Sequence, residues 1–372
     1  MLVLTLPLVK HFVTKDKIKS GENRNLAQKP HLPKNYKSIQ KFINQTDDYL
    51  SDQFGFRKNF IAAANKIKFK IFNEISSKQV TVGENNFLFF NSHMVSRPNS
   101  LIKSVCGINS VSKKFKAETK NSVINFIDET SRFGIVTNIA IIPTKSRIYP
   151  EKLPLLLRKW CLTTTSTWRD ELIEDISQTH KIYYPLRKML SMKKEMAVYL
   201  PSYFHWRGQS TYVIAEDMMK SLWQISPEFK PKSMPVQVKS DLRMHTKGLH
   251  LYNDSLTYDF KNNGIVECHG KACLPELLRY YKRAVSHRYI NENAKNSRTL
   301  LIISDSFGPP IAEYFSRGFS QVISINFSNL TKDEKPEFYR WITTILKPSH
   351  MLFLIHDGGV FGLANRLKSF QN

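Results

Sequence analysis

The sequence predicts an α/β fold with a mostly parallel β-sheet, and two observations support this class. First, short segments typical of buried strands recur along the chain, at residues 135–143, 300–303, 321–327 and 351–355, and the run at 300–303 is wholly apolar. Second, segments with helical periodicity lie between such runs, as at residues 332–346. Strands that alternate with helices in this way indicate a parallel sheet with right-handed crossovers.

The run at 300–303 is the central element of this prediction. It is followed by Ser-Asp-Ser-Phe-Gly at residues 304–308 and by two prolines that can begin a helix. A strand, a tight turn and a helix would hold the Ser306 hydroxyl above the sheet edge, where open α/β folds place their chemistry. Asp305 and Ser306 could instead only cap the helix. The turn is therefore a candidate nucleophile site with a structural alternative.

The length and composition limit the possible partners. A chain of 372 residues, 41% hydrophobic, can form one large domain with additions or two domains. Lys and Arg number 55 against 31 Asp and Glu, a net charge of +24 that favours nucleic acid, anionic lipid or an acidic polysaccharide. No helix-turn-helix, zinc-finger or RNA-binding motif is present, so we do not expect nucleic acid.

The amino terminus has the pattern of an anchor and a linker. Residues 1–9 are apolar but too short to span a bilayer, and a polar, basic stretch follows them. We therefore predict that residues 1–37 are a truncated membrane anchor and linker. Residues 38–372 are predicted to form one domain, with an N-terminal helical arm at about 36–72 and an irregular insertion around 225–298.

Three further residues are candidates for the site. Lys145 and Tyr149 follow the strand at 135–143, so they lie where a site can form, or in a solvated loop. His205 lies in a loop before the predicted helix at 209–223, where it could be a base or a packed structural residue.

The cysteines leave a metal site possible without indicating one. Cys268 and Cys273 enclose His269, but their spacing fits no standard zinc pattern. A local disulfide and two buried thiols are both open interpretations. We predict that the protein has no metal and no cofactor.

Several motifs together resemble one family. They are Glu22-Asn-Arg-Asn-Leu-Ala27, Asp52-Gln-Phe-Gly-Phe-Arg57, Val82 to Phe89, Ile142-Pro-Thr-Lys145, His205-Trp206 and the 304–308 turn. Their order is similar to that of the alginate O-acetyltransferase family of the AlgJ and AlgX type, over about residues 20–357. The resemblance implies an SGNH-hydrolase-like three-layer domain with Ser306 as the nucleophile and His205 as the base.

The family's acid falls on Tyr203, which cannot be a permanent carboxylate. In a serine protease, loss of that charge lowers the rate roughly 10⁴-fold. Asp241 or Glu195 could orient His205 instead, or Tyr203 could do so weakly through its hydroxyl. Alternatively, the site could be catalytically degraded, so that the protein is a glycan-binding scaffold.

The usual SGNH layout offers another base. It places this histidine near the C-terminal strand, where His356 and Asp357 are adjacent. We therefore keep His356 as a lesser candidate base, with a polar strand-end residue as its structural alternative.

The resemblance implies a function. We expect a periplasmic protein, tethered to the inner membrane, that O-acetylates an exopolysaccharide through an acyl-serine. A membrane-bound O-acyltransferase would supply the acetyl group, and the positive charge is compatible with an acidic polymer. The same residues with water as acceptor would form a carbohydrate esterase.

Overall fold

The computed structural model describes residues 27–33, 35–53, 57–163, 166–269 and 286–371. Contacts divide the chain into two compact units. One unit comprises residues 1–77 and 242–251, and the other comprises residues 78–241 and 252–372. Of the predicted anchor and linker at residues 1–37, residues 1–26 lie outside the described residues. Within the described part, no helix combines the length and apolar composition needed to cross a membrane.

The smaller unit contains the predicted N-terminal helices. They are η1 (Tyr36–Ser38), α2 (Ile39–Gln53) and α3 (Arg57–Phe72). The loop at 242–251 packs on α3, and Asn65 Nδ2 in that helix donates a hydrogen bond to the Lys247 carbonyl at 2.8 Å. Gly248 has a φ of +77°, and a Cβ there would lie 2.4 Å from that of Ala62, so this contact requires glycine.

The larger unit is built on a seven-stranded sheet with the order β4-β3-β11-β9-β10-β8-β7. The first five strands are parallel, and the last two add antiparallel pairings at one edge. This confirms the predicted α/β class. The strands are β3 (Val136–Ile142), β4 (Ile182–Tyr183), β7 (Ile265–His269), β8 (Ser286–Asn291), β9 (Thr299–Ser304), β10 (Gln321–Asn326) and β11 (His350–His356).

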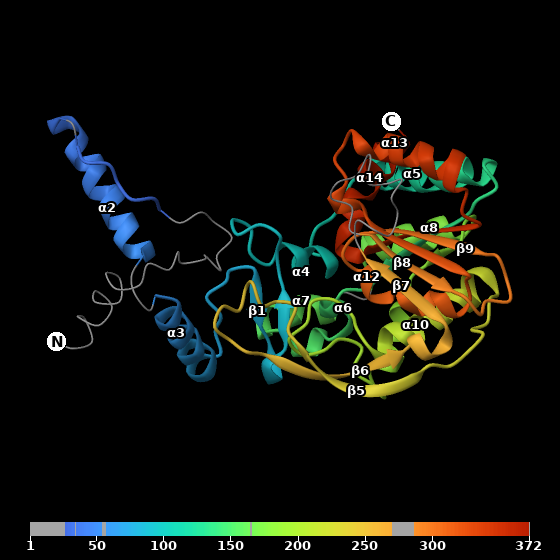
Figure 1. The fold of residues 1–372 in the computed structure, drawn as a ribbon, viewed down its shortest axis with the longest axis horizontal. Helices are drawn as coiled ribbons and strands as arrows, with labels where there is room; N and C mark the ends of the chain where they lie inside the picture. The colour runs from blue at the N-terminus through green and yellow to red at the C-terminus, as the bar shows by residue number, and fades with distance from the viewer. Residues whose placement is uncertain (1–26, 34, 54–56, 164–165, 270–285, 372) are drawn as a thin grey trace. The chain divides into compact units, whose positions relative to one another are not determined.

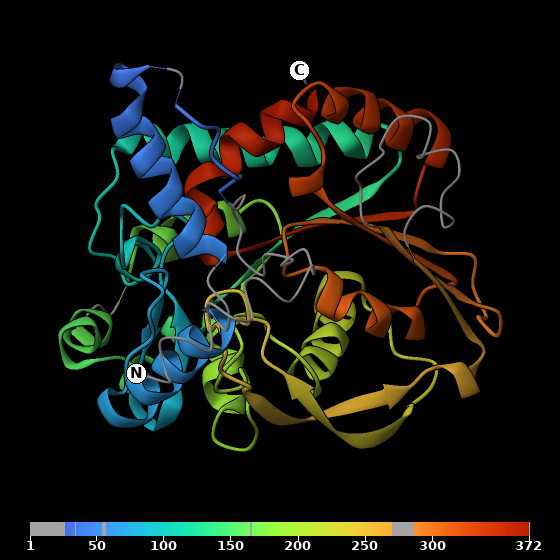
Figure 2. The ribbon, with the colours of Figure 1, turned by 60° about the vertical axis from the view of Figure 1, so that its left-hand side comes forward.

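Helices cover both faces of this sheet, which confirms the predicted three layers (Figure 1). Alternate residues of β3, β9, β10 and β11 share one buried apolar cluster with four helices. These are α5 (Lys113–Arg132), α8 (Trp168–Ser177), α13 (Glu334–Trp341) and α14 (Leu363–Gln371). Figure 2 shows the opposite face, covered by α10 (Gln209–Trp223), α12 (Pro309–Ala312) and η6 (Glu313–Arg317).

Shorter elements surround these layers. β1 (Val80–Val82) and β2 (Leu88–Phe90) form a hairpin around η2 (Glu84–Asn86). The others are α4 (Ser100–Val105), α6 (Lys145–Ile148), η3 (Pro150–Lys152), α7 (Leu155–Thr163), α9 (Leu186–Met192), η4 (Lys261–Asn263), η7 (Phe327–Asn329), η8 (Ile342–Leu346) and η9 (Asp357–Gly362).

The segment around 225–298, for which the sequence predicts an irregular insertion, contains regular strands among its described residues. This segment forms the antiparallel pair β5 (Lys232–Lys239) and β6 (Tyr252–Asp259), together with β7 and β8 of the main sheet. Much of β5 and β7 is exposed, which explains the mixed polar sequence. A wholly apolar run marks only strands that are buried on both faces.

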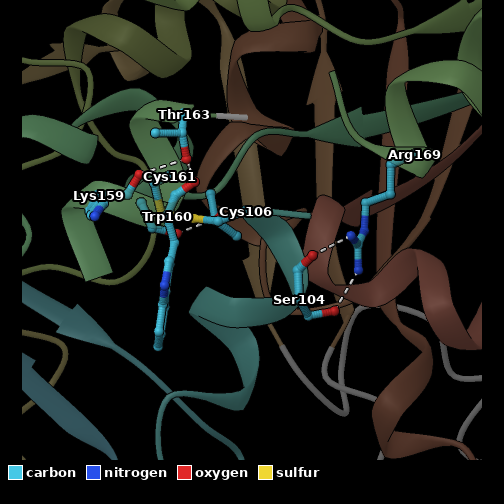
Figure 3. Close-up of a disulfide and its surroundings, with 9 residues drawn as sticks. Ser104, Cys106, Lys159, Trp160, Cys161, Thr163 and Arg169 are labelled. Carbon is cyan, nitrogen blue, oxygen red and sulfur yellow. Dashed lines mark hydrogen bonds between the residues drawn. A yellow bond between two sulfur atoms is a disulfide. The ribbon is translucent and has the colours of Figure 1, made fainter. Parts of the chain in front are cut away.

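A disulfide that the sequence did not predict joins Cys106, after α4, to Cys161 in α7. Figure 3 shows it together with Ser104, whose hydroxyl accepts a hydrogen bond from the buried Arg169 at 2.6 Å. Cys268 is disulfide-bonded as well, so the free-thiol interpretation is wrong for it. Cys273 lies outside the described residues.

Candidate active site

Ser306 lies exposed at the carboxyl end of β9, on a turn whose other residues are buried. Asp305 holds this turn, because its carboxylate accepts hydrogen bonds from the N–H groups of Phe307 at 2.9 Å and His356 at 3.0 Å. These bonds tie the turn to the end of the neighbouring strand β11. Burial raises the pKa of Asp305. Asp305 thus fixes the backbone of the turn that carries Ser306.

A continuous hydrogen-bonded chain joins Ser306 to a carboxylate. His205 Nε2 lies 2.8 Å from Ser306 Oγ. On the other side of the ring, His205 Nδ1 lies 2.7 Å from Asp241 Oδ2. The side chains of His205 and Asp241 are 25% and 21% exposed, so the pair is sheltered but accessible. Serine, imidazole and carboxylate in this order are the arrangement that activates a serine hydroxyl.

Backbone contacts hold His205 and Asp241 as one unit. The Asp241 carboxylate also accepts from the N–H groups of Phe204 at 2.9 Å and His205 at 3.1 Å. Trp206, which is fully buried, donates from Nε1 to the Phe307 carbonyl at 2.8 Å and so joins this loop to the nucleophile turn. Sequence reasoning noticed Trp206 only as a motif neighbour, although its indole sets the spacing between the two loops.

Tyr203 does not take the position of the acid. Its hydroxyl donates to the Lys239 carbonyl at 2.5 Å, and its ring packs with Leu200 and Val238. The position of the acid is taken by Asp241, because strand β5 ends at Lys239 and the chain that follows it places Asp241 beside the imidazole of His205. Of the two substitute carboxylates considered from the sequence, Asp241 is the one that contacts His205, and Glu195 is not.

Lys145 and Tyr149 support the loop that leads to His205. Lys145 is 2% exposed, and burial holds its pKa well below the ordinary value. Its Nζ lies within hydrogen-bond distance of four carbonyl oxygens, those of Leu88, Leu200, Pro201 and Tyr203, at 3.0, 2.7, 2.5 and 3.1 Å. The Tyr149 hydroxyl accepts from the Val198 N–H at 3.0 Å, and burial raises its pKa. Neither residue lies in a solvated loop, and neither contacts Ser306 directly.

His356 is not placed to act on Ser306. Its side chain is 7% exposed, and its Nε2 lies 3.8 Å from Asp305 Oδ2, too far for a hydrogen bond. Within the described residues its Nδ1 has no hydrogen-bond partner. Burial, aided by the charges of His93 and Arg366, holds the pKa of His356 well below 6.5. His356 is therefore a buried polar residue at the end of a strand, which is the structural alternative given for it above.

The nucleophile turn also presents a donor for a developing oxyanion. Its Asp305, Phe307 and Gly308 N–H groups donate to acceptors inside the protein. Among the described residues, no group accepts a hydrogen bond from the N–H of Ser306 itself. A backbone N–H of this kind beside the nucleophile can stabilise the oxyanion of a tetrahedral intermediate.

Comparison with known proteins yields solved structures alone. No family model and no curated protein match the chain. Bacillus cereus PatB1 with a sulfonyl adduct is similar at 13% identity, covering 76% of this chain and 97% of that one, with a TM-score of 0.49. A DHHW family protein from Eubacterium siraeum is 14% identical, with coverages of 68% and 88% and a TM-score of 0.48.

A third similar structure is the O-acetyltransferase domain of Pseudomonas putida AlgJ. It is 12% identical and covers 76% of this chain and 92% of that domain, with a TM-score of 0.44. These likenesses concern the fold, and the activity has to be argued from the site itself.

Proposed function

We propose that this protein is a serine acyltransferase that moves an acetyl group onto a polysaccharide hydroxyl through an ester on Ser306. The observation that supports this is the hydrogen-bonded chain from Ser306 through His205 to Asp241. A serine hydroxyl is a poor nucleophile until a base takes its proton, and His205 is in contact with that proton. Asp241 orients the imidazole and stabilises the imidazolium that forms.

In the first half of the reaction, Ser306 Oγ attacks the carbonyl carbon of the acetyl donor while His205 Nε2 takes the hydroxyl proton. The Ser306 N–H lies beside the nucleophile and stabilises the oxyanion that develops. When the tetrahedral intermediate collapses, the bond to the donor's leaving group breaks, and His205 returns the proton to that group. The acetyl group then remains on Ser306 as an ester.

In the second half, a sugar hydroxyl attacks the ester and His205 takes its proton. Collapse of the second intermediate breaks the bond to Ser306 Oγ, which recovers its proton from His205. Because Ser306 is exposed, a long polymer can approach it. With water as the acceptor, the same steps would make an esterase. The scaffold alternative depended on a missing acid, and Asp241 removes that reason for it.

We also propose a location and partners. Disulfides persist in oxidising compartments, and Cys106 and Cys161 form one in this chain, which supports a periplasmic location. The sequence resemblance supports an inner-membrane tether and a membrane-bound O-acyltransferase as the acetyl source. The charge of +24 favours an acidic polysaccharide. Binding of an oligouronate should weaken as salt is added, and salt-independent binding would contradict the electrostatic contribution.

The test is covalent trapping of the intermediate. The full chain is mixed with 4-nitrophenyl acetate, quenched in acid and weighed by intact-protein mass spectrometry. One added acetyl group is expected on the wild type and on Ser328→Ala, an exposed serine after β10 that serves as the control. Ser306→Ala should gain none. Acetylated Ser306→Ala, or a folded wild type that is never acetylated, would contradict the proposal.

Transfer and hydrolysis are then separated by the acceptor. Oligouronates are added to the acetylated protein, and the products are separated by mass. An acetylated oligosaccharide supports a transferase, whereas free acetate alone at every acceptor concentration supports an esterase.

A further inference from the structure

The antiparallel strands β7 and β8 bring three potential metal ligands to one face at the edge of the main sheet. His269 and His287 are directly paired across the two strands. Glu267 is two residues before His269, so its side chain lies on the same face of β7. Cross-strand partners and i, i+2 neighbours on one face are close enough to share a ligand.

The distances confirm that the three side chains converge. Glu267 Oε1 lies 3.1 Å from His269 Nε2 and 3.7 Å from His287 Nδ1. One ligand atom from each of the three residues falls within 4.8 Å of the other two. The side chain of His269 is 61% exposed, whereas those of Glu267 and His287 are 34% and 21% exposed. Solvent therefore has access to the cluster from the His269 side.

We propose that Glu267, His269 and His287 bind one divalent transition-metal ion of the zinc class. Two imidazole nitrogens and one carboxylate oxygen are a donor set that zinc commonly accepts. With bonds of about 2.1 Å, ligand atoms around a tetrahedral ion lie about 3.4 Å apart, close to the two separations from Glu267. The open side at His269 leaves room for water as a fourth ligand.

The surroundings fit a site on the surface of a strand pair. Tyr289 is paired with Glu267 across the two strands and shares a side-chain hydrogen bond with it, so it can act as an outer partner of the ligand set through that carboxylate. Cys268 pairs with Arg288 and packs against the apolar cluster on the opposite face, so its sulfur does not belong to the site. This explains why cysteine spacing gave no indication of the site, which depends on the pairing of the two strands.

The ion would stabilise the sheet edge. β7 is the outermost strand of the sheet and is paired with β8 alone among its strands. A metal bound to residues of both strands would hold this pair together in the folded state and not in the unfolded state. Zinc should therefore raise the melting temperature of the protein in proportion to its binding.

The experiment uses the full chain, treated with EDTA and dialysed. Zinc chloride is titrated by calorimetry at pH 7.5, and the melting temperature is measured with and without zinc. We expect one equivalent to bind and the melting temperature to rise. In His269→Gln and Glu267→Gln, affinity for that equivalent should fall at least about 10-fold, since changes even to outer partners of a metal cost that much. His269→Gln alters an exposed side chain, so folding is not at risk.

Two controls address other zinc-binding groups. His250→Gln, an exposed histidine outside this strand pair, should bind zinc as the wild type does. Asp241→Asn tests whether zinc binds instead at the His205–Asp241 pair of the proposed acyl-transfer site, and this variant should also bind one equivalent of zinc. The proposal is overturned if the wild type binds no zinc, or if His269→Gln and Glu267→Gln bind it with wild-type affinity. Neither result depends on whether Ser306 becomes acetylated.

Discussion

His205 and His356 have similar surroundings, yet only one of them contacts Ser306. Both imidazoles pack against Phe204 and Phe307, at centroid distances of 4.8 and 5.1 Å for His205 and 6.0 and 5.1 Å for His356. Each lies near a carboxylate. His205, however, is hydrogen-bonded to Asp241 at 2.7 Å, whereas His356 Nε2 is 3.8 Å from Asp305. Aromatic packing near a carboxylate is therefore not the feature that distinguishes the proposed base, His205, from His356.

Two physical differences separate these histidines. His205 is partly exposed at the nucleophile, so it can exchange protons with a substrate, whereas His356 is buried between strand ends. The carboxylate of Asp241 can stabilise an imidazolium, whereas burial lowers the pKa of His356 and disfavours its imidazolium. For the base that we propose, these differences predict that a hydrogen-bonded carboxylate and access to the reacting atoms are both required.

The largest effect should come from His205→Ala. Without the base, the Ser306 hydroxyl keeps its proton, and acetylation should fall about 10⁶-fold, in practice to the background rate. The measurement is the rate of 4-nitrophenol release under single-turnover conditions. If His356→Leu lowered this rate as much as His205→Ala, the assignment of the two histidines would be reversed.

Asp241→Asn should have the next largest effect. The amide keeps the size of the side chain but loses the charge that stabilises the imidazolium, so the rate should fall about 10⁴-fold. Tyr203→Phe is the matched control, because it removes only a hydroxyl bonded to the Lys239 carbonyl and should cost less than about 10-fold. Equal losses in both variants would restore Tyr203 as the orienting group.

Lys145→Met tests whether the position of His205 depends on its loop. The substitution removes one donor from each of four carbonyl groups, of which those of Leu200 and Pro201 keep a backbone donor, so it should cost about 1–3 kcal/mol in the free energy of unfolding. A loosened loop should also lower the acetylation rate about 100-fold, since displacements of about 1 Å have effects of that size. Urea unfolding and the single-turnover assay measure the two effects. The exposed Lys159→Met is the control, and a normal rate in Lys145→Met would show that the loop is held by other contacts.

The smallest effect on activity belongs to His356→Leu, which should change the acetylation rate less than about 3-fold because His356 does not touch Ser306. The wild type and His356→Leu should differ instead in how the free energy of unfolding depends on pH. Below about pH 6.5 the unfolded chain binds a proton at His356 that the native protein, with its lowered pKa, does not bind. The free energy of unfolding should therefore fall as the pH drops below 6.5, and this part of the fall should be absent in His356→Leu. Urea unfolding at pH 7.5 and pH 5 measures it, and equal losses in both proteins would show that His356 titrates normally.

The strands that the sequence revealed are those with two buried faces. The runs at residues 300–303 and 351–355 lie inside β9 and β11, and both were predicted to be strands of a parallel sheet. β5 and β7 were missed because exposed strand residues are polar and resemble a loop. The same limit applies to the disulfide, because Cys106 and Cys161 are 55 residues apart and no local spacing joins them.

The sequence by itself determined the sheet and the two active-site motifs, because hydrophobic periodicity and a polar strand end are local properties of the chain. It placed Ser306 at a strand tip and His205 in a loop before a helix. Only the tertiary structure decided which carboxylate meets His205, since Asp241 arrives from 36 residues away through the β5–β6 pair. It also decided that Lys145 binds the backbone carbonyl groups of the loop before His205. Contacts between such distant segments depend on how the whole chain packs.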